Sequence, residues 1–204
     1  MVEHQLRQRG IRDPRVLDVM GEVPRERFVP PEQQLFAYED RPLPIGDDQT
    51  ISQPYIVALM TEMLAPGPED RCLEIGAGSG YQTAILARLC RQVYTIDRLE
   101  SLVSKARATL EALGIANVEF RTGDGTLGWP ELAPFDRILV TAGAPKLPPV
   151  LVDQLADGGR LVAPVGGAEH QVLTTVERRT GRIIETPGIG CRFVKLIGRD
   201  GWGS

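Results

Sequence analysis

The sequence predicts an α/β fold, a doubly wound three-layer α/β/α sandwich on a mixed sheet of about seven strands. Strand and helix patterns alternate between residue 70 and about residue 165. Repeated alternation of this kind gives a parallel sheet with helices on both faces. A glycine-rich turn follows the first of these strands, and two strand-like runs joined by a turn come after residue 166.

Composition narrows the class of protein. Hydrophobic residues make up 42% of the 204 residues, and the longest apolar run is far shorter than a membrane span. We therefore expect a cytoplasmic protein without a targeting segment. The net charge of −4 argues against nucleic acid or a membrane surface as partner. Two histidines and three widely spaced cysteines predict no metal site and reduced thiols.

We expect a single domain over residues 1–204, divided into three zones. Residues 1–64 form a helical cap with a loop, residues 65–165 form the βα core, and residues 166–204 form the C-terminal strands. Ligands of such sheets bind beyond the carboxyl ends of the parallel strands.

The first zone contains two clear helix patterns. Asp13 is a good N-cap residue, and Pro14 suits the first helical position. Residues 40–51 show no hydrophobic period, so we expect a long loop there. The second helix begins with Ser52 as its N-cap and ends at residues 65–68, which are rich in proline and glycine.

The remaining elements follow from apolar runs and turn residues. Strands are predicted at residues 71–75, 92–96, 118–122, 135–140 and 160–165, and helices at residues 81–89, 99–113 and 148–155. In the last zone, residues 171–176 and 183–184 flank a hairpin turn at residues 178–181, and residues 192–197 are a further strand candidate.

The strongest feature is the glycine-rich turn at the end of the first core strand. Glu74, Gly76, Gly78 and Gly80 make an ExGxGxG pattern. A dinucleotide-binding fingerprint would require glycine where Tyr81 stands. The spacing instead resembles the first motif of the class I S-adenosylmethionine-dependent methyltransferases. This resemblance implies S-adenosyl-L-methionine as cofactor and S-adenosyl-L-homocysteine as product.

Two later acids support the cofactor prediction. Asp97 ends the second core strand, where a carboxylate can accept hydrogen bonds from ribose hydroxyls. Asp124 follows the third strand, and in the methyltransferases that the chain resembles an acid at this point holds the adenine amino group. Each acid alone would more simply be a helix cap or a turn residue.

Two features that the sequence lacks indicate the chemical class of the methyl acceptor. Residues 140–145 do not contain the NPPY-like sequence of methyltransferases that act on amino nitrogen, and no Cys–His or Lys–Asp arrangement offers a general base. A carboxylate is already ionised at neutral pH and needs no base. Alignment alone can lower such a barrier by about 7–11 kcal/mol. These observations favour a carboxylate acceptor.

Several segments spread over nearly the whole chain are informative together: residues 42–46 (PLPIG), 49–55 (QTISQPY), 73–82, 135–136 with 140–142, 155–166 and 191–198. In this order they resemble the protein-L-isoaspartate (D-aspartate) O-methyltransferase family. The resemblance implies the Rossmann-like class I methyltransferase fold, with small N-terminal helices over the cofactor. It also implies methylation of the free α-carboxylate of L-isoaspartyl residues, and weakly of D-aspartyl residues, in damaged proteins and peptides. The ester then collapses to a succinimide, which returns partly to normal aspartate.

The resemblance also assigns site residues. Ser52 is the catalytic residue, and the implied substrate contacts are Ser52, Arg192, Phe193 and Val194. The implied cofactor contacts are Gln49, Thr50, Ile51, Ser52, Glu74, Gly76, Ala77, Gly78, Ser79, Gly80, Asp97, Arg98, Asp124 and Gly125. As a helix N-cap, Ser52 would lie where backbone N–H groups favour an anion. Capping alone is its simpler role.

The chain departs from the family's pattern at a few positions. Asp97 stands where many members have Glu, and Lys195 replaces the usual proline of the closing strand. Three other functions are less well supported. The full-length resemblance argues against methylation of a different carboxylate, and Tyr81 argues against nicotinamide-dependent oxidoreduction. The intact glycine turn, both acids and Ser52 argue against a non-catalytic scaffold. A monomer is the default expectation, and no metal is implied.

Overall fold

A computed structural model describes residues 1–203 and contains a mixed seven-stranded sheet in the order β5-β4-β3-β6-β7-β8-β9. The strands are β3 (Arg71–Ile75), β4 (Gln92–Asp97), β5 (Val118–Thr122), β6 (Phe135–Val140), β7 (Leu155–Gly166), β8 (Gln171–Arg179) and β9 (Arg182–Cys191). Strands β3 to β7 run parallel, whereas β8 and β9 are antiparallel to their neighbours. The predicted fold class is confirmed.

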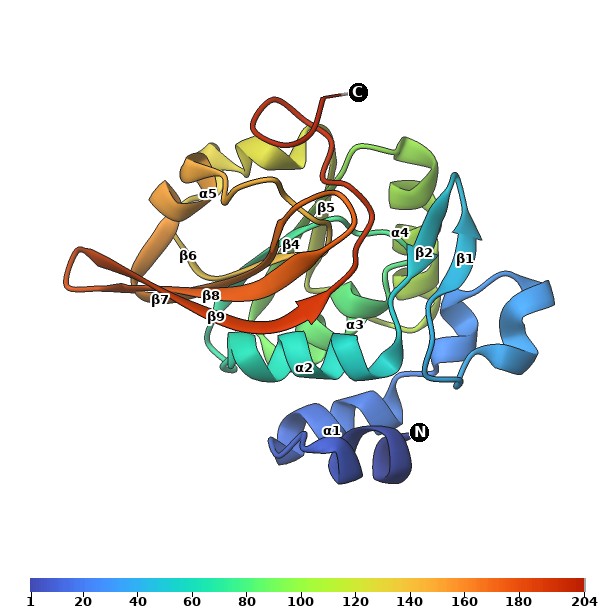
Figure 1. The fold of residues 1–204 in the computed structure, drawn as a ribbon. Helices are drawn as coiled ribbons and strands as arrows, with labels where there is room; N and C mark the ends of the chain where they lie inside the picture. The colour runs from blue at the N-terminus through green and yellow to red at the C-terminus, as the bar shows by residue number, and fades with distance from the viewer. Residues whose placement is uncertain (204) are drawn as a thin grey trace.

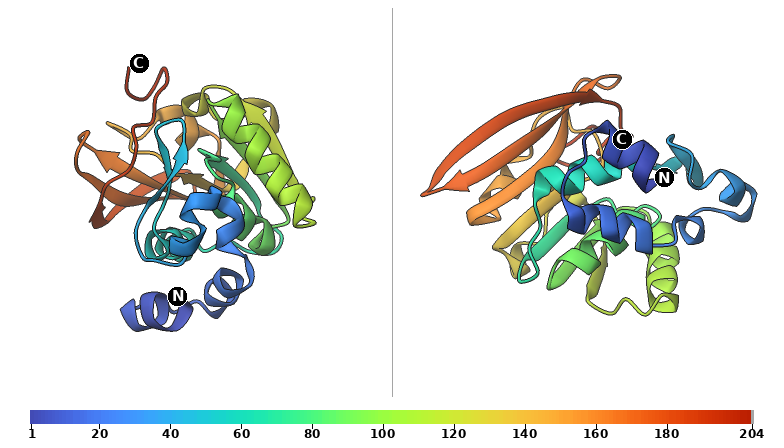
Figure 2. Two further views of the ribbon diagram at one scale, coloured as in Figure 1. Left: turned by 90° about the vertical axis from the view of Figure 1, so that its right-hand side faces the viewer. Right: turned by 90° about the horizontal axis from the view of Figure 1, so that it is seen from below.

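Helices cover both faces of the sheet (Figures 1 and 2). They are α1 (Pro14–Glu22), α2 (Pro54–Leu64), α3 (Tyr81–Leu89), α4 (Glu100–Ala112) and α5 (Pro149–Asp153). The core forms two clusters because strand side chains alternate between faces. Cys72 and Leu139 pack with α1 to α4 in one cluster, while Leu73 and Ile138 pack with α5 in the other.

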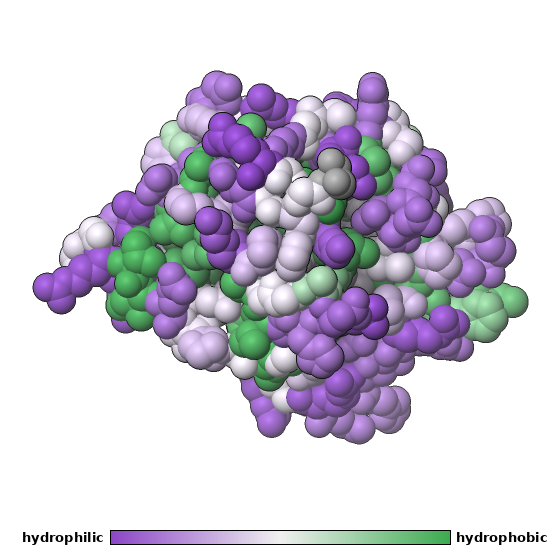
Figure 3. Space-filling model, turned by 45° about the horizontal axis from the view of Figure 1, so that its top comes forward, coloured by the Kyte–Doolittle hydropathy of each residue, from purple (hydrophilic) through white to green (hydrophobic). Residues whose placement is uncertain are grey.

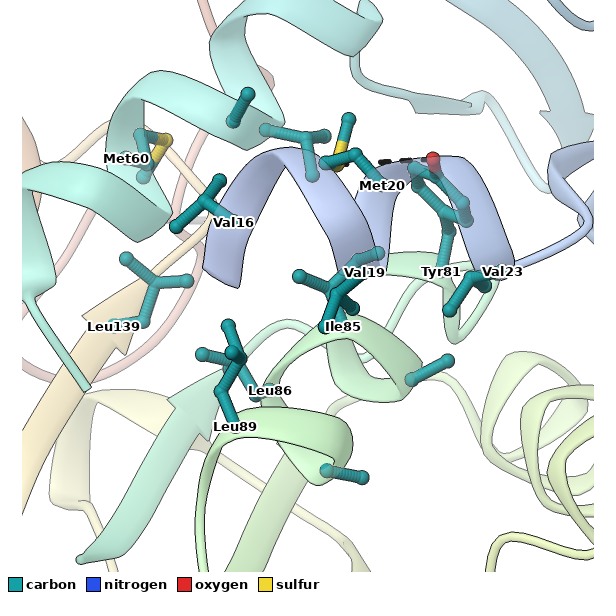
Figure 4. Close-up of a cluster of buried hydrophobic side chains, with 14 of the residues drawn as sticks. Val16, Val19, Met20, Val23, Met60, Tyr81, Ile85, Leu86, Leu89 and Leu139 are labelled. Atoms are coloured by element: carbon teal, nitrogen blue, oxygen red, sulfur yellow. Dashed lines mark hydrogen bonds between the residues drawn. The ribbon is translucent and has the colours of Figure 1, made fainter. Parts of the chain in front are cut away.

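The N-terminal segment belongs to this core. Val16, Val19 and Met20 of α1 are buried; Val19 lies against Ile85 of α3, and the Met20 sulfur accepts a hydrogen bond of 3.8 Å from the Tyr81 hydroxyl (Figure 4). Asp13 caps α1 as predicted, since its side chain accepts a hydrogen bond from the Arg15 backbone N–H. Burying a side chain of this size contributes about 1.5–3 kcal/mol, so the segment is stabilised by packing rather than by local propensity.

The prediction of a long loop at residues 40–51 is wrong in part. It contains a two-stranded hairpin, β1 (Leu43–Gly46) and β2 (Gln49–Ile51). Its two turn residues, Asp47 and Asp48, have φ angles of 53° and 55°. Positive φ at both positions matches the twist of a tight hairpin, and Asp tolerates that conformation better than most residues. The strands are too short to show an alternating pattern.

The predicted N-cap of the second helix is also wrong. Gln53, not Ser52, is the N-cap of α2, and its side chain makes no capping hydrogen bond. The first turn is capped from elsewhere in the chain: Asp40 Oδ1 accepts a hydrogen bond of 3.0 Å from the Tyr55 N–H. A distant carboxylate therefore replaces the local hydroxyl.

The strand expected at residues 192–197 does not join the sheet. Gly143 N–H donates to the Val194 carbonyl at 2.7 Å, and Leu196 N–H donates to the Gly143 carbonyl at 2.9 Å. These bonds hold the segment against the loop after β6. Strand β9 is longer than the predicted residues 183–184. Strands β8 and β9 carry the exposed side chains of Val172, Ile183 and Ile184. Figure 3 shows apolar residues on the left of the molecule, the side toward which β8 and β9 extend in Figure 1.

Candidate active site

A cavity opens at the carboxyl ends of β3, β4 and β6, next to the hairpin β1–β2. The space not filled by atoms measures about 900 Å³, counting the open mouth. Most of the predicted cofactor residues line it: Gln49, Thr50, Ile51, Ser52, Gly76, Ala77, Gly78, Ser79, Asp97, Arg98 and Gly125. This position is the one where doubly wound sheets bind ligands, beside the point where strand order reverses.

The glycine turn brings backbone close to the cavity. Gly76 has a φ of +100°, and a Cβ atom there would lie 2.3 Å from Thr141 Oγ1. The Thr141 hydroxyl donates to the Gly76 carbonyl at 2.7 Å, which ties the loop after β6 to the turn after β3. Only glycine combines this backbone conformation with this approach. The turn therefore offers a cradle for a ligand's polar groups.

Asp97 lies at the end of β4 and faces the same cavity. Its Oδ2 accepts from the Gly78 N–H at 2.9 Å, and its Oδ1 accepts from the Leu99 N–H at 3.0 Å. Two backbone donors fix the carboxylate, yet each oxygen keeps a lone pair for another donor. That arrangement suits two neighbouring hydroxyl groups.

Glu74 lies beneath the turn rather than in the cavity. Its Oε2 accepts hydrogen bonds from Thr83 Oγ1 at 2.5 Å and Thr95 Oγ1 at 2.6 Å, which joins β3 to α3 and β4. Burial raises the pKa of Glu74 to about 8. The residue therefore supports the glycine turn from behind, and the carboxyl group is protonated at neutral pH.

Two other predicted cofactor residues lie outside the cavity lining. Asp124 accepts from the Thr126 N–H at 2.9 Å and from the Arg199 N–H at 2.8 Å. Burial opposes ionisation, but these hydrogen bonds lower the pKa of Asp124. A Cβ at Gly80 would lie 2.9 Å from Leu110 Cδ1, so this glycine permits close packing of α3 on α4.

A second depression adjoins the first. The predicted substrate residues Arg192, Phe193 and Val194 line it, together with Glu169, which forms an exposed ion pair of 2.8 Å with Arg192. Both depressions share the same boundary residues: Thr50, Ser52, Thr141, Phe193, Val194 and Lys195. Ser52 is therefore placed at the junction of a cofactor-sized cavity and a second open groove.

Sequence reasoning missed two residues that shape this junction. Thr141 touches both depressions, and the buried Gln171 holds two walls of the second one. Gln171 Nε2 donates to the Gly167 carbonyl at 2.5 Å, and its Oε1 accepts from the Phe193 N–H at 2.8 Å. A single buried amide in a strand gives no sequence signal of such a role.

The sheet order, the glycine turn and the cavity at the switch point define a Rossmann-like α/β methyltransferase fold. A solved protein-L-isoaspartate O-methyltransferase is similar, with a TM-score of 0.86 and 31% identity, covering 98% of this chain and 67% of the other. A Plasmodium falciparum structure that carries the same enzyme name and holds S-adenosyl-L-homocysteine gives a TM-score of 0.84 and 29% identity over 96% of both chains.

The sequence comparisons agree with the structural ones. A family model described as protein-L-isoaspartate(D-aspartate) O-methyltransferase (PCMT) matches residues 1–201. Relatives named protein-L-isoaspartate O-methyltransferase include one from Methanoregula boonei, 60% identical over 99% of this chain and 93% of its own length. One from Trichlorobacter lovleyi is 56% identical over 99% and 94%. The chain belongs to the protein-L-isoaspartate (D-aspartate) O-methyltransferase family.

Within residues 1–203, no group of three or more His, Cys, Asp or Glu side chains is arranged to hold a metal ion. In the same residues, no helix has the length and apolar character needed to cross a membrane.

Proposed function

We propose that this protein transfers a methyl group from S-adenosyl-L-methionine to the free α-carboxylate of L-isoaspartyl residues, and weakly of D-aspartyl residues, in damaged proteins. The carrying observation is the junction at Ser52, where a cavity with a glycine cradle meets a groove that is open to a peptide. Family membership supports both the reaction and the substrate class.

The residues of the first cavity fit the cofactor. The glycine turn would hold the amino-acid portion, Asp97 would accept from the ribose hydroxyls, and residues 49–51 would cover the ligand. When bound there, the cofactor would supply a methyl group on a cationic sulfur, and that sulfur would keep the electron pair of the broken bond when the carboxylate oxygen takes the methyl group. The residues of this chain would then have no proton to move.

The protein's part is alignment and the exclusion of water. In this proposal the Ser52 hydroxyl donates a hydrogen bond to the substrate carboxylate, so one oxygen faces the first cavity. The segment with Arg192, Phe193 and Val194 holds the peptide main chain in the second depression. Holding two reactants in line supplies about 7–11 kcal/mol of the barrier reduction. No general base is required because the acceptor is already ionised.

We further propose that the protein acts as a monomer in the cytoplasm on isoaspartyl proteins and peptides, without nucleic acid, membrane or metal as partners. The net charge of −4 supports the exclusion of nucleic acid.

The deciding experiment measures methyl transfer from labelled S-adenosylmethionine to two synthetic peptides. They are identical except that one carries L-isoaspartate and the other L-aspartate at the same position. We expect base-labile label on the isoaspartyl peptide alone. Label on neither peptide, with S-adenosylhomocysteine still bound, would contradict the repair function and favour a different carboxylate acceptor.

A further inference from the structure

A buried arginine lies directly behind the proposed catalytic segment. Arg25 follows Pro24 in a short 3-10 turn, and its side chain is fully buried. Its Nε donates to the Ala37 carbonyl at 2.7 Å, and its Nη2 donates to the Ser52 carbonyl at 2.7 Å. The guanidinium therefore joins the N-terminal segment to the residue at the junction of the two depressions.

The same guanidinium contacts the start of α3. Its carbon atom lies 4.8 Å from the centre of the Tyr81 ring, and Tyr81 directly follows the glycine turn and lines the first cavity. One side chain thus touches both the segment that would orient the substrate and the helix that begins at the cofactor cradle.

The other end of the catalytic segment is held from the same region. Asp40 Oδ1 accepts from the Tyr55 N–H, as described above, and Asp40 is itself ion-paired with Arg9. Pro54 lies between the two anchors and has no N–H to donate. The Arg25 guanidinium therefore holds the Ser52 carbonyl, and the Asp40 carboxylate holds the Tyr55 backbone N–H.

Burying the Arg25 guanidinium is costly. Arg25 takes part in none of the ion pairs within residues 1–203, and its Nη1 is buried without a hydrogen-bond partner. Removing such a charge from water costs several kcal/mol even after relaxation. Burial lowers the pKa of Arg25 to about 10, so it is still charged at neutral pH. An apolar side chain would avoid this cost but would leave the Ala37 and Ser52 carbonyls without their donor.

We propose that Arg25 is a positioning residue for methyl transfer: its fork to the Ala37 and Ser52 carbonyls fixes the Ser52 peptide, and so aims the Ser52 hydroxyl. This inference rests on the proposed function. It assigns to the N-terminal segment a role in turnover beyond covering the cavity.

The test replaces Arg25 in the full chain and separates turnover from cofactor binding. Arg25→Met leaves both carbonyls without their donor. We expect kcat on the isoaspartyl peptide to fall about 10–100-fold, the loss typical of a small misplacement, in protein that is still folded. The dissociation constant for S-adenosylhomocysteine should change less than about threefold, because the cradle keeps its own hydrogen bonds. Arg25→Lys keeps the charge but cannot fork, so it should recover only part of kcat.

Arg137 offers a matched control. It also donates to a carbonyl, that of Ala65, and it pairs with Asp70 away from both depressions. Arg137→Met should lower the melting temperature and leave kcat unchanged. Wild-type kcat in folded Arg25→Met, or equal loss of kcat in both variants at equal loss of stability, would overturn the proposal. Loss of S-adenosylhomocysteine binding in parallel with kcat would overturn it too, because Arg25 would then support the cradle.

A second pair of variants keeps the proposal testable if Arg25→Met does not fold. Asp40→Asn and Asp40→Ala both lose the pair with Arg9, but only Asn keeps an acceptor for the Tyr55 N–H. We expect Asp40→Ala to lose more kcat than Asp40→Asn at equal affinity for S-adenosylhomocysteine. Equal kcat in the two variants would contradict positioning of this segment. If the wild-type protein itself fails to label the isoaspartyl peptide, the proposed function fails rather than this inference.

Discussion

Ser52 contributes its carbonyl and its hydroxyl to different tasks. The carbonyl accepts from Arg25, while within residues 1–203 the hydroxyl has no hydrogen-bond partner. An unused hydroxyl at the junction of two depressions is available to a substrate. This free donor, rather than the helix-capping role expected from the sequence, supports the catalytic role that we propose for Ser52.

We expect Ser52→Ala to lower kcat on the isoaspartyl peptide by about 10–100-fold and to leave the affinity for S-adenosylhomocysteine nearly unchanged. The reason is that the lost donor orients the carboxylate and does not touch the glycine turn. Steady-state kinetics and calorimetric titration measure the two effects. Ser104→Ala, on the exposed side of α4, is the control. Unchanged kcat with near-normal KM for the peptide would leave Ser52 without a catalytic role.

Glu74 predicts a pH dependence of stability. Burial raises its pKa to about 8 in the folded protein, while an unfolded Glu ionises near pH 4.3. Between these values the folded state keeps a proton that the unfolded state has lost, so the free energy of unfolding falls as pH rises. Glu74→Gln cannot ionise and lacks this dependence. Wild type should therefore lose stability relative to the variant by up to about 1.4 kcal/mol per pH unit.

Denaturant unfolding of both proteins at pH 5 and pH 8 measures this difference. The comparison within one pH cancels the titration of all other groups. Parallel pH profiles for the two proteins would mean that Glu74 is ionised in the folded state. In that case a donor besides Thr83 and Thr95 would have to stabilise its charge.

The hairpin β1–β2 illustrates how an element can be present without a clear sequence pattern. Its inner residues, Leu43 and Ile51, are buried and paired across the two strands. Asp47 Oδ2 accepts a hydrogen bond of 3.0 Å from Ser101 Oγ, which fastens the tip to α4. The hairpin closes one side of the cofactor cavity. It is stabilised by packing on other elements rather than by the β propensity of its own short strands.

We expect Asp48→Gly to stabilise the protein slightly. Asp48 has a φ of 55°, which costs an L-residue up to about 1–2 kcal/mol and costs glycine little. A gain of 1 kcal/mol corresponds to a rise of about 2–4 °C in melting temperature for a chain of this size. Asp48→Val should lower it, since a β-branched residue is poorly tolerated there. Thermal melts of the three proteins measure these differences. A lower melting temperature for Asp48→Gly than for wild type would show that the Asp48 side chain itself stabilises the fold.

In the whole molecule α1 packs against α2 and α3, while the hairpin β1–β2 lies at the carboxyl edge of the sheet with the C-terminal segment nearby (Figures 1 and 2). The cavity lining comes from residues 49–52, the glycine turn, the end of β4 and residues 193–197. Because these segments are far apart in the sequence, a ligand that bridges them should stabilise the entire fold.

We expect S-adenosylhomocysteine at about 100 times its dissociation constant to stabilise the protein by about 2.7 kcal/mol. This corresponds to a rise of about 5–10 °C in melting temperature. NAD at the same concentration should have no effect, because Tyr81 stands where a dinucleotide-binding fingerprint requires its last glycine. Stabilisation by NAD alone would contradict the methyltransferase assignment and favour an oxidoreductase.

Local patterns were sufficient for the βα core. Strands β3, β5 and β6 and helix α3 have the predicted bounds, and the glycine turn was recognised from four residues. Buried parallel strands are short apolar runs bounded by turn residues, and their helices carry an apolar stripe. These signals lie within each segment, so the sequence alone determined the sheet class, the position of the cofactor cradle and the resemblance to a family.

Only the tertiary structure decided how the remaining segments meet at the site. Asp40 caps α2, Gly143 holds residues 194–196, and Arg25 holds Ser52. Each of these hydrogen bonds joins residues far apart in the sequence, and each depends on which backbone groups the packed fold leaves without a local partner. A buried polar group must find such a partner, and periodicity along the chain does not reveal which one it finds.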